Sequence, residues 1–153
     1  MDLKGLNKFL INAHINGYAS SGEGGEKSLP DGSKELEYKE ELFFVRDRYF
    51  GSNPFGGEEV VFYRQQPVWL MNYYGKVIAE SASIKEVYSF LKEALKKVPQ
   101  DKPYRGPDNF KSGNFKYSNK VEGAVEKFIG EEKIYYKKEL VYVAKYHGGL
   151  ISK

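Results

Sequence analysis

The chain has 153 residues, enough for one domain of ordinary size, with 41% hydrophobic residues for a core and a net charge of +3. It contains no Cys, which excludes disulfide scaffolds, thiolate catalysis and Cys-ligated zinc or iron–sulfur sites. With only two His and no apolar run of roughly 18 residues, we expect no metal site, no cofactor, no membrane span and a cytoplasmic location.

The first half of the chain is predicted to form a helix followed by four strands. Apolar residues at helical spacing predict the helix over 2–14, and Asp2 can cap its start. The Gly- and Ser-rich stretch 17–33 predicts a loop. Apolar or alternating segments then predict strands over 35–39, 42–50, 58–64 and 67–74.

The second half shows the same order of elements. A helix is predicted over 84–97, where Ser83 and Glu86 can form a capping box and Pro99 ends the helical pattern. Strands are predicted over 108–111, 114–121, 131–137 and 140–147.

The two halves also resemble each other residue by residue. Residues 55–78 align with residues 128–151 without a gap, and nine of the 24 positions are identical. Matches in the same order extend upstream of both segments. We therefore predict an internal duplication within a single domain, with repeats at about 2–80 and 83–152.

The predicted fold class is α+β: a helix plus a four-stranded antiparallel meander, present twice and related by a pseudo-two-fold axis. The strands over 67–74 and 140–147 are apolar on both alternating faces, so we expect them at the centre of the sheet and covered on both sides. A single repeat is marginal for a core, so the halves should bury each other. A shared sheet and a partly closed barrel both satisfy this requirement.

Five ordered blocks resemble a family known as domain of unknown function 5680. They are FGGEEVVFY at 55–63, PVWLMNYYGKV at 67–77, FLKEALKKVP at 90–99, PYRGPDNF at 103–110 and HGGLI at 147–151. The resemblance runs from Leu6 to Ile151. Such proteins occur in bacteria and archaea, alone or behind a helix-turn-helix of the XRE repressor type, for which we expect no room in this chain. The resemblance implies an architecture and a sensing role, and it assigns no catalytic residues.

Polar residues follow apolar ones on the last predicted strand of each half. Asn72 and Tyr74 correspond to Lys145 and His147, and a pseudo-two-fold axis would bring all four to one end of the sheet. Together they can hydrogen-bond a small ligand. The alternative is that they are ordinary polar residues where a strand approaches solvent.

Three other residues are candidates for ligand contacts. Arg105, in the stiff loop 103–107, can clamp a carboxylate or phosphate, or it can tie loop carbonyls together. Tyr104 beside it and Trp69 can stack on a ring-shaped ligand, although aromatic residues at this density usually pack a core.

Paired acids at two predicted strand starts are candidates for acid–base chemistry. Neighbouring strand residues face opposite sides, so only one acid of each pair can join a common site. Glu58 and Glu131 are the candidates, with a structural role as the alternative, and His147 is a further candidate base. The preceding Phe-x-Gly at 55–57 predicts a bulge or tight bend.

These patterns favour a non-catalytic, sensor-like domain that binds a small anionic or aromatic ligand in an aromatic-lined cleft between the repeats. A small hydrolase or isomerase with His147 or Glu58 as base is the first alternative. A nucleic-acid or protein interaction surface on the second half is the other, since residues 81–153 carry a net charge of +6. Their cations are fourteen Lys and only one Arg, which disfavours nucleic acid. A homodimer is compatible with exposed sheet edges.

Overall fold

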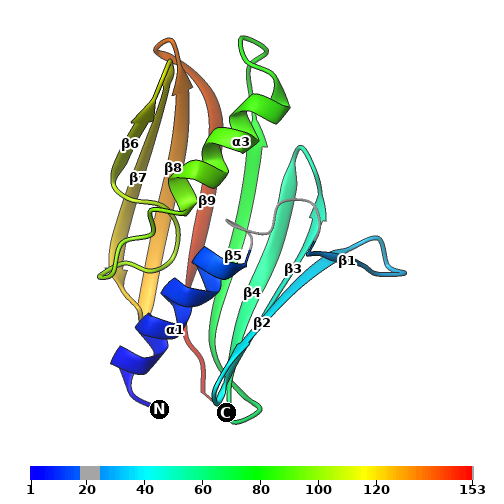
Figure 1. Ribbon diagram of the computed structural model, residues 1–153, viewed down its shortest axis with the longest axis vertical. Coiled ribbons are helices and arrows are strands. Elements are labelled where there is room, and N and C mark those ends of the chain that lie inside the picture. Colours follow the sequence, from blue (N-terminus) through cyan, green and yellow to red (C-terminus); the bar gives the residue numbers. More distant parts are fainter. Residues whose placement is uncertain (18–24, 153) are drawn as a thin grey trace.

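In the computed structural model, which describes residues 1–17 and 25–152, two helices pack on one face of a nine-stranded antiparallel sheet (Figure 1). The helices are α1 (Leu3–Asn16) and α3 (Ile84–Leu95). The strands are β1 (Lys27–Ser28), β2 (Lys34–Glu40), β3 (Phe43–Gly51), β4 (Phe55–Tyr63), β5 (Gln66–Val77), β6 (Asn109–Ser112), β7 (Phe115–Ala124), β8 (Lys127–Tyr136) and β9 (Glu139–Leu150).

The sheet joins the two halves of the chain through its central pair of strands. The strand order is β1-β2-β3-β4-β5-β9-β8-β7-β6, and β5 pairs with β9 over nine positions from Trp69↔Leu150 to Val77↔Tyr142. The last strand of each half therefore lies at the centre, as the sequence predicted. The edges, β1 and β6, are not paired with each other, so the sheet is open and the partly closed barrel is not formed.

Both helix starts follow the predicted capping chemistry. Asp2 accepts a hydrogen bond from the Gly5 amide at 2.5 Å, and Ser83 and Glu86 form the reciprocal capping box. The second helix is shorter than predicted and has Lys96 as its C-cap, three residues before Pro99.

The helices cover different parts of the same sheet face. The apolar side of α1 packs with Val45, Val61, Trp69 and Met71, on β3 to β5. The apolar side of α3 packs with residues of β5 and β7 to β9, which include Val77, Tyr117, Ile134 and Tyr142. The sheet surface beside α3, above β3 and β4, is the place where the candidate site lies.

The other face of the sheet corrects one prediction. The central strands were expected to be covered on both sides, but no described element packs on the outer face, and Tyr74 there is 57% exposed. The outer apolar residues Leu70 and Val143 are half-buried. Neighbouring strands place long side chains beside them, so cross-strand packing on one sheet face shields them without a second layer.

The strand irregularities also differ from the prediction. No bulge occurs at 55–57, where β4 pairs regularly with β3 and β5. The register shifts lie instead at Val61/Phe62 and at Ile134/Tyr135, next to the hairpin turns. Those turns place two residues each at positive φ, at 64–65 and 137–138. The predicted loop 17–33 also contains the short strand β1, while residues 18–24 of it lie outside the described residues.

Candidate functional site

A cavity of about 710 Å³ lies on the helix-covered face, bounded by α3, the end of α1 and strands β3 to β5. Five polar residues line its inner part, and we call them the polar cluster: His14, Asp47, Glu59, Tyr73 and Arg105. They come from the last turn of α1, from three neighbouring strands and from the loop after α3. Elements distant in the chain therefore meet at one place above the sheet.

His14 and Glu59 form an ion pair in the polar cluster. His14 Nε2 lies 2.9 Å and 3.1 Å from the two carboxylate oxygens of Glu59, which is 4% exposed. Burial alone would lower the pKa of His14, but the Glu59 carboxylate outweighs burial and raises it. The Nδ1 atom of His14 is buried and has no hydrogen-bond partner among the described residues.

Asp47 lies directly opposite Glu59, as its register partner on the neighbouring strand. The Tyr73 hydroxyl donates to Asp47 Oδ1 at 2.5 Å. Burial raises the pKa of Asp47, and the nearby Glu59 carboxylate raises it further, to about 7, against the lowering effect of the Tyr73 hydrogen bond. Asp47 therefore exchanges its proton near neutral pH.

A glycine makes the Tyr73–Asp47 contact sterically possible. Gly57 lies between them on β4, and a Cβ atom there would come within 2.6 Å of the Tyr73 hydroxyl and 2.5 Å of the Arg48 carbonyl oxygen. Only a residue without a side chain lets the Tyr73 ring cross the neighbouring strand. This is the physical role of the Gly that the sequence suggested as a bend.

Arg105 forms an ion pair with Glu132 on β8. Its Nη2 and Nε atoms donate to the two Glu132 carboxylate oxygens at 2.5 Å and 3.2 Å. The hydroxyls of Tyr117 and Tyr142 donate to the same carboxylate at 2.6 Å and 2.9 Å. Burial would lower the pKa of Arg105, but Glu132 raises it well above its usual value, so the guanidinium stays charged.

The second half of the sheet contains a matching tyrosine contact with different chemistry. Tyr146 donates to Asn119 Oδ1 at 2.7 Å, and Gly130 leaves room for its ring. Asn119 lies opposite Glu132, as Asp47 lies opposite Glu59. The Asp47–Glu59 pair thus has two carboxyl groups where its counterpart has one carboxylate and a neutral amide.

Apolar and aromatic side chains form one wall of the cavity. The wall contains Phe55 and Tyr88, whose rings meet edge to face at 5.9 Å, together with Leu91 and Leu95 of α3. Next to this wall, Arg105 lies 5.9 Å from the centre of the Tyr73 ring. The cavity therefore combines a ring-binding surface with the polar cluster.

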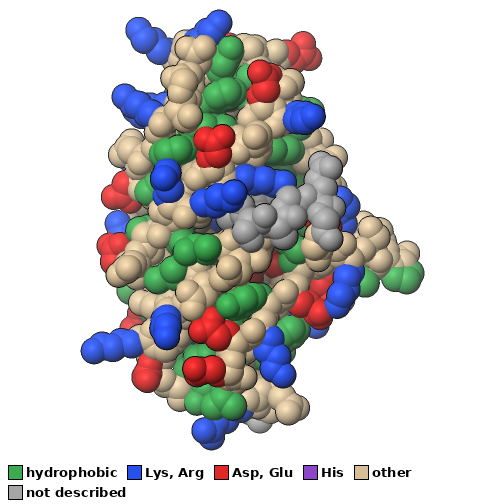
Figure 2. Space-filling model, viewed as in Figure 1, with side chains coloured by type: hydrophobic (Ala, Val, Ile, Leu, Met, Phe, Trp, Pro, Cys, Tyr) green, Lys and Arg blue, Asp and Glu red, His purple; other side chains and the backbone are tan. Residues whose placement is uncertain are grey.

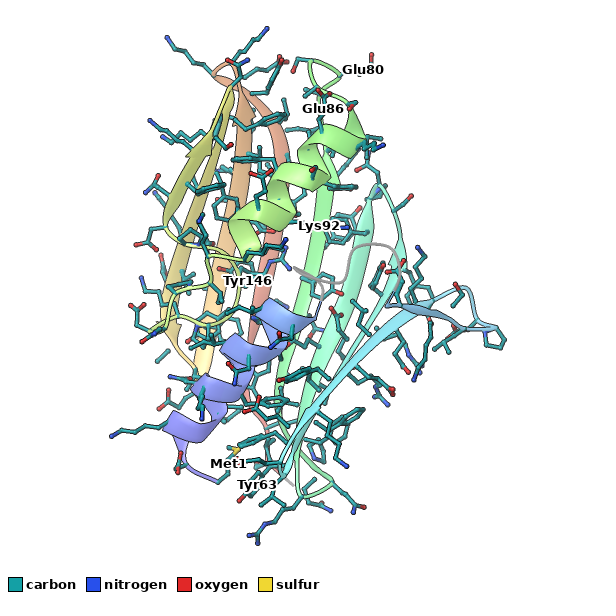
Figure 3. The ribbon with its side chains drawn as sticks, viewed as in Figure 1. Met1, Tyr63, Glu80, Glu86, Lys92 and Tyr146 are labelled. Carbon is teal, nitrogen blue, oxygen red and sulfur yellow. The ribbon has the colours of Figure 1, made fainter. Side chains whose placement is uncertain are left out.

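Basic residues lie around the opening. Lys85 and Lys92 of α3 line the cavity, as do Lys34 and Glu26, which pair at 2.7 Å. Lys92 lies near the middle of the view in Figure 3, and Figure 2 shows Lys and Arg side chains near the middle of the same face. The opening is therefore more basic than the interior.

The structure brings together the four polar residues predicted on the central strands, but not in the cavity. Asn72 pairs with His147 and Tyr74 pairs with Lys145 across β5 and β9. All four lie on the outer sheet face, opposite the helices. The cavity contains none of them.

The predicted acids lie on that outer face as well. Glu58 pairs with Asn72 and accepts a hydrogen bond from it at 3.3 Å, and Glu131 pairs with Lys145. The second acid of each pair points to the interior. Glu59 lines the cavity, and Glu132 accepts the hydrogen bonds of Arg105.

The other three predicted residues lie on the helix face. Trp69 is fully buried, stacks on Phe128 with ring centres 5.5 Å apart, and donates from its indole to the Val125 carbonyl at 3.1 Å. Tyr104 also stacks on Phe128, with ring centres 4.0 Å apart, and it lines the cavity. Arg105 lines the cavity too, although both of its bonded nitrogens are directed to Glu132.

Sequence reasoning missed His14, Asp47, Glu59 and Tyr73 as site residues. The signal for Tyr73 and Glu59 was present, since both are identical between the aligned halves. Asp47 aligns with Asn119 at the spacing of the upstream matches, and that change from amide to acid could have identified it. No pattern in the sequence connects His14 to Glu59, because their contact depends on how α1 crosses the sheet.

The described residues contain no group of three or more His, Asp or Glu side chains arranged to hold a metal ion. Neither described helix has the length and apolar character to cross a membrane.

The family model described as Domain of unknown function (DUF5680) matches residues 47–151, about two thirds of the chain. The chain belongs to this family. No curated protein and no solved structure matches it. The DUF5680 match begins at Asp47 and includes Glu59, Tyr73 and Arg105, whereas His14 precedes it. The resemblance expected from Leu6 onward is thus found from residue 47.

Proposed function

We propose that this domain binds a small organic molecule, without transforming it, in the cavity beside α3. The observation that carries the proposal is the cavity itself: about 710 Å³, with an aromatic wall on one side and the polar cluster on the other. Ligand sites in proteins combine these features, because apolar walls supply affinity and a few polar groups fix orientation.

The contrast between the two buried clusters supports this site. Glu132 is held by Arg105, Tyr117 and Tyr142, which satisfies a buried carboxylate. The Asp47–Glu59 pair places two carboxyl groups side by side and borders the cavity. A fold selected only for stability favours the first arrangement, so the second indicates a role in binding.

The internal duplication is our interpretation of several matched features. The hairpin turns at 64–65 and 137–138 and the register shifts at 61/62 and 134/135 are each 73 residues apart, the offset of the sequence alignment. The Tyr73–Asp47 and Tyr146–Asn119 contacts also correspond. We infer that one ancestral unit was copied and that the first copy acquired the binding site.

The other predicted roles stay predictions. His147 and Glu58 lie on the open outer face and do not line the cavity, so catalysis by either residue would occur outside the cavity. A nucleic-acid or protein surface on the Lys-rich second half, a homodimer and a cytoplasmic location likewise rest on the sequence alone.

A thermal-shift screen with small anionic, cationic and aromatic metabolites tests the binding proposal, because a ligand of the native state raises the melting temperature. Hits should disappear in Ser89→Phe, which fills the cavity from α3. They should persist when Asn72, Lys145 and His147 on the outer face are replaced together by Ala. The cavity would be rejected as the binding site if the hits were lost in the outer-face variant and kept in Ser89→Phe. It would also be rejected if the screen gave no hit.

A further inference from the structure

We propose that the ligand carries a flat organic cation, such as an amidinium, a guanidinium or a protonated aminoheterocycle. This inference rests on the proposed function. The cationic group binds the Asp47 carboxylate, and a ring of the ligand packs against Phe55 and Tyr88.

The charges of the two buried clusters do not balance. Three carboxyl groups, of Asp47, Glu59 and Glu132, face two groups that can be positive, His14 and Arg105. Even with His14 protonated, one negative charge is left over when all three acids ionise. A buried, uncompensated charge is unfavourable, so it must be neutralised by a proton or by a bound cation.

Asp47 is the carboxyl group that can bind the proton or the cation. Its Oδ1 accepts from Tyr73, whereas no described residue donates to Oδ2. Its side chain is partly accessible through the cavity that it lines. Two parallel N–H groups of an amidinium match the two oxygens of a carboxylate, and this bidentate geometry distinguishes a flat cation from a compact one.

The same contacts disfavour the anionic ligand that the sequence suggested. Arg105, the expected anion clamp, is already bound through two nitrogens to Glu132. His14 is bound to Glu59. An anion in the interior would meet Asp47 and Glu59 without a free cationic partner among these residues.

The basic opening determines which cations fit. Lys34, Lys85 and Lys92 line the cavity together with Glu26, so the potential becomes more negative from the opening inward. A ligand with its cationic group inside and acceptor groups at the opening matches this gradient. Tyr104, whose buried hydroxyl has no partner among the described residues, also borders the cavity and can donate to such an acceptor after a small shift.

The test uses three probes of nearly equal shape and different charge: benzamidine, benzamide and benzoate. Isothermal titration calorimetry at pH 8 should show benzamidine binding at least about 10-fold more tightly than benzamide, with benzoate weakest. Benzamidine affinity should also increase from pH 6 to pH 8, because Asp47 must release its proton to accept the cation.

Asp47→Asn should weaken benzamidine at least about 10-fold and leave benzamide nearly unchanged. Glu58→Gln is the matched control, since it removes a carboxylate from the same β3–β4 pair on the opposite face and should leave all three affinities unaltered. Circular dichroism confirms that Asp47→Asn is folded.

Failure of this inference differs from failure of the binding proposal. If screening hits are lost in Ser89→Phe while benzamidine fails to bind, or binds equally well to Asp47→Asn, the cation is rejected and the cavity site stands. Benzoate binding more tightly than benzamidine also rejects the cation. If neither the screen nor the probes bind, both proposals fall.

Discussion

At the scale of single residues, the two halves of this sheet differ in one buried contact, which involves an acid in the first half and an amide in the second. Tyr146 bonds to Asn119, whereas Tyr73 bonds to Asp47. The acid sits opposite Glu59, and its pKa is raised to about 7. Burial of the Asp47 carboxyl group should therefore make the stability of the protein depend on pH.

We predict that the contribution of Asp47 to the free energy of unfolding falls as pH rises from about 4 to about 7. The folded state holds the Asp47 proton up to pH 7, whereas the unfolded chain releases it near 4, so the slope approaches about 1.4 kcal/mol per pH unit within this window. His14, whose folded pKa is raised, adds a loss of stability as pH rises through that pKa, above 6.5.

Asp47→Asn should remove the Asp47 part of this slope and be more stable than the original chain at pH 8. Urea denaturation at pH 4, 6 and 8 measures both proteins. Parallel curves for the two proteins across this range would contradict the assignment.

Removal of the Glu132 carboxylate should instead lower the stability of the protein. Glu132→Gln leaves the buried Arg105 guanidinium without its counter-ion and should cost about 3 kcal/mol. The matched control is Glu131→Gln, because Glu131 is on the outer face and its contact with Lys133 is partly exposed, at 36% and 34% of the two side chains. Guanidinium denaturation of the two variants compares them, and equal stabilities would show that the Arg105 network contributes little.

At the scale of elements, the strands and helices could be predicted because each has a local signal. Alternation and turn residues placed eight strands, and Ser83 with Glu86 placed the start of α3. The face that each strand turns to the helices had no such signal, because β5 is apolar on both sides. The choice between Glu58 and Glu59 depends on that face, and for this reason the predicted residues lie on the face of the sheet opposite the cavity.

The hairpin turns give a prediction at this scale. Lys138 has a φ of 74° in the turn between β8 and β9, a conformation that favours Gly. Lys138→Gly should therefore stabilise the protein by about 0.5 to 1 kcal/mol, seen as a higher urea midpoint. Gln65→Gly, at φ 66° in the other hairpin, should give a similar gain. A loss of stability in both variants would contradict the turn geometry.

At the scale of the whole molecule, the central pair β5 and β9 makes the halves depend on each other. Each half contributes one of these strands, and α1 residues share a core cluster with Phe128 and Tyr146 of the second half. Amides at the β5–β9 junction, such as those of Asn72 and His147, should thus be protected up to the free energy of global unfolding in hydrogen exchange. Two exchange classes that separate β2–β5 from β7–β9 would instead mean that the halves unfold independently.

The short strands at the two ends of the sheet affect how copies of this chain meet. β1 has two residues and β6 has four, and each carries a Lys. β1 pairs with only Lys34 and Glu35 of β2, and β6 pairs with only residues 115–118 of β7. The outer edges of β2 over 36–40 and of β7 over 120–124 therefore have no partner strand among the described residues, and another chain can add a strand there. If copies of this chain associate edge to edge, the contact should therefore form along β2 or β7 and not along the two end strands.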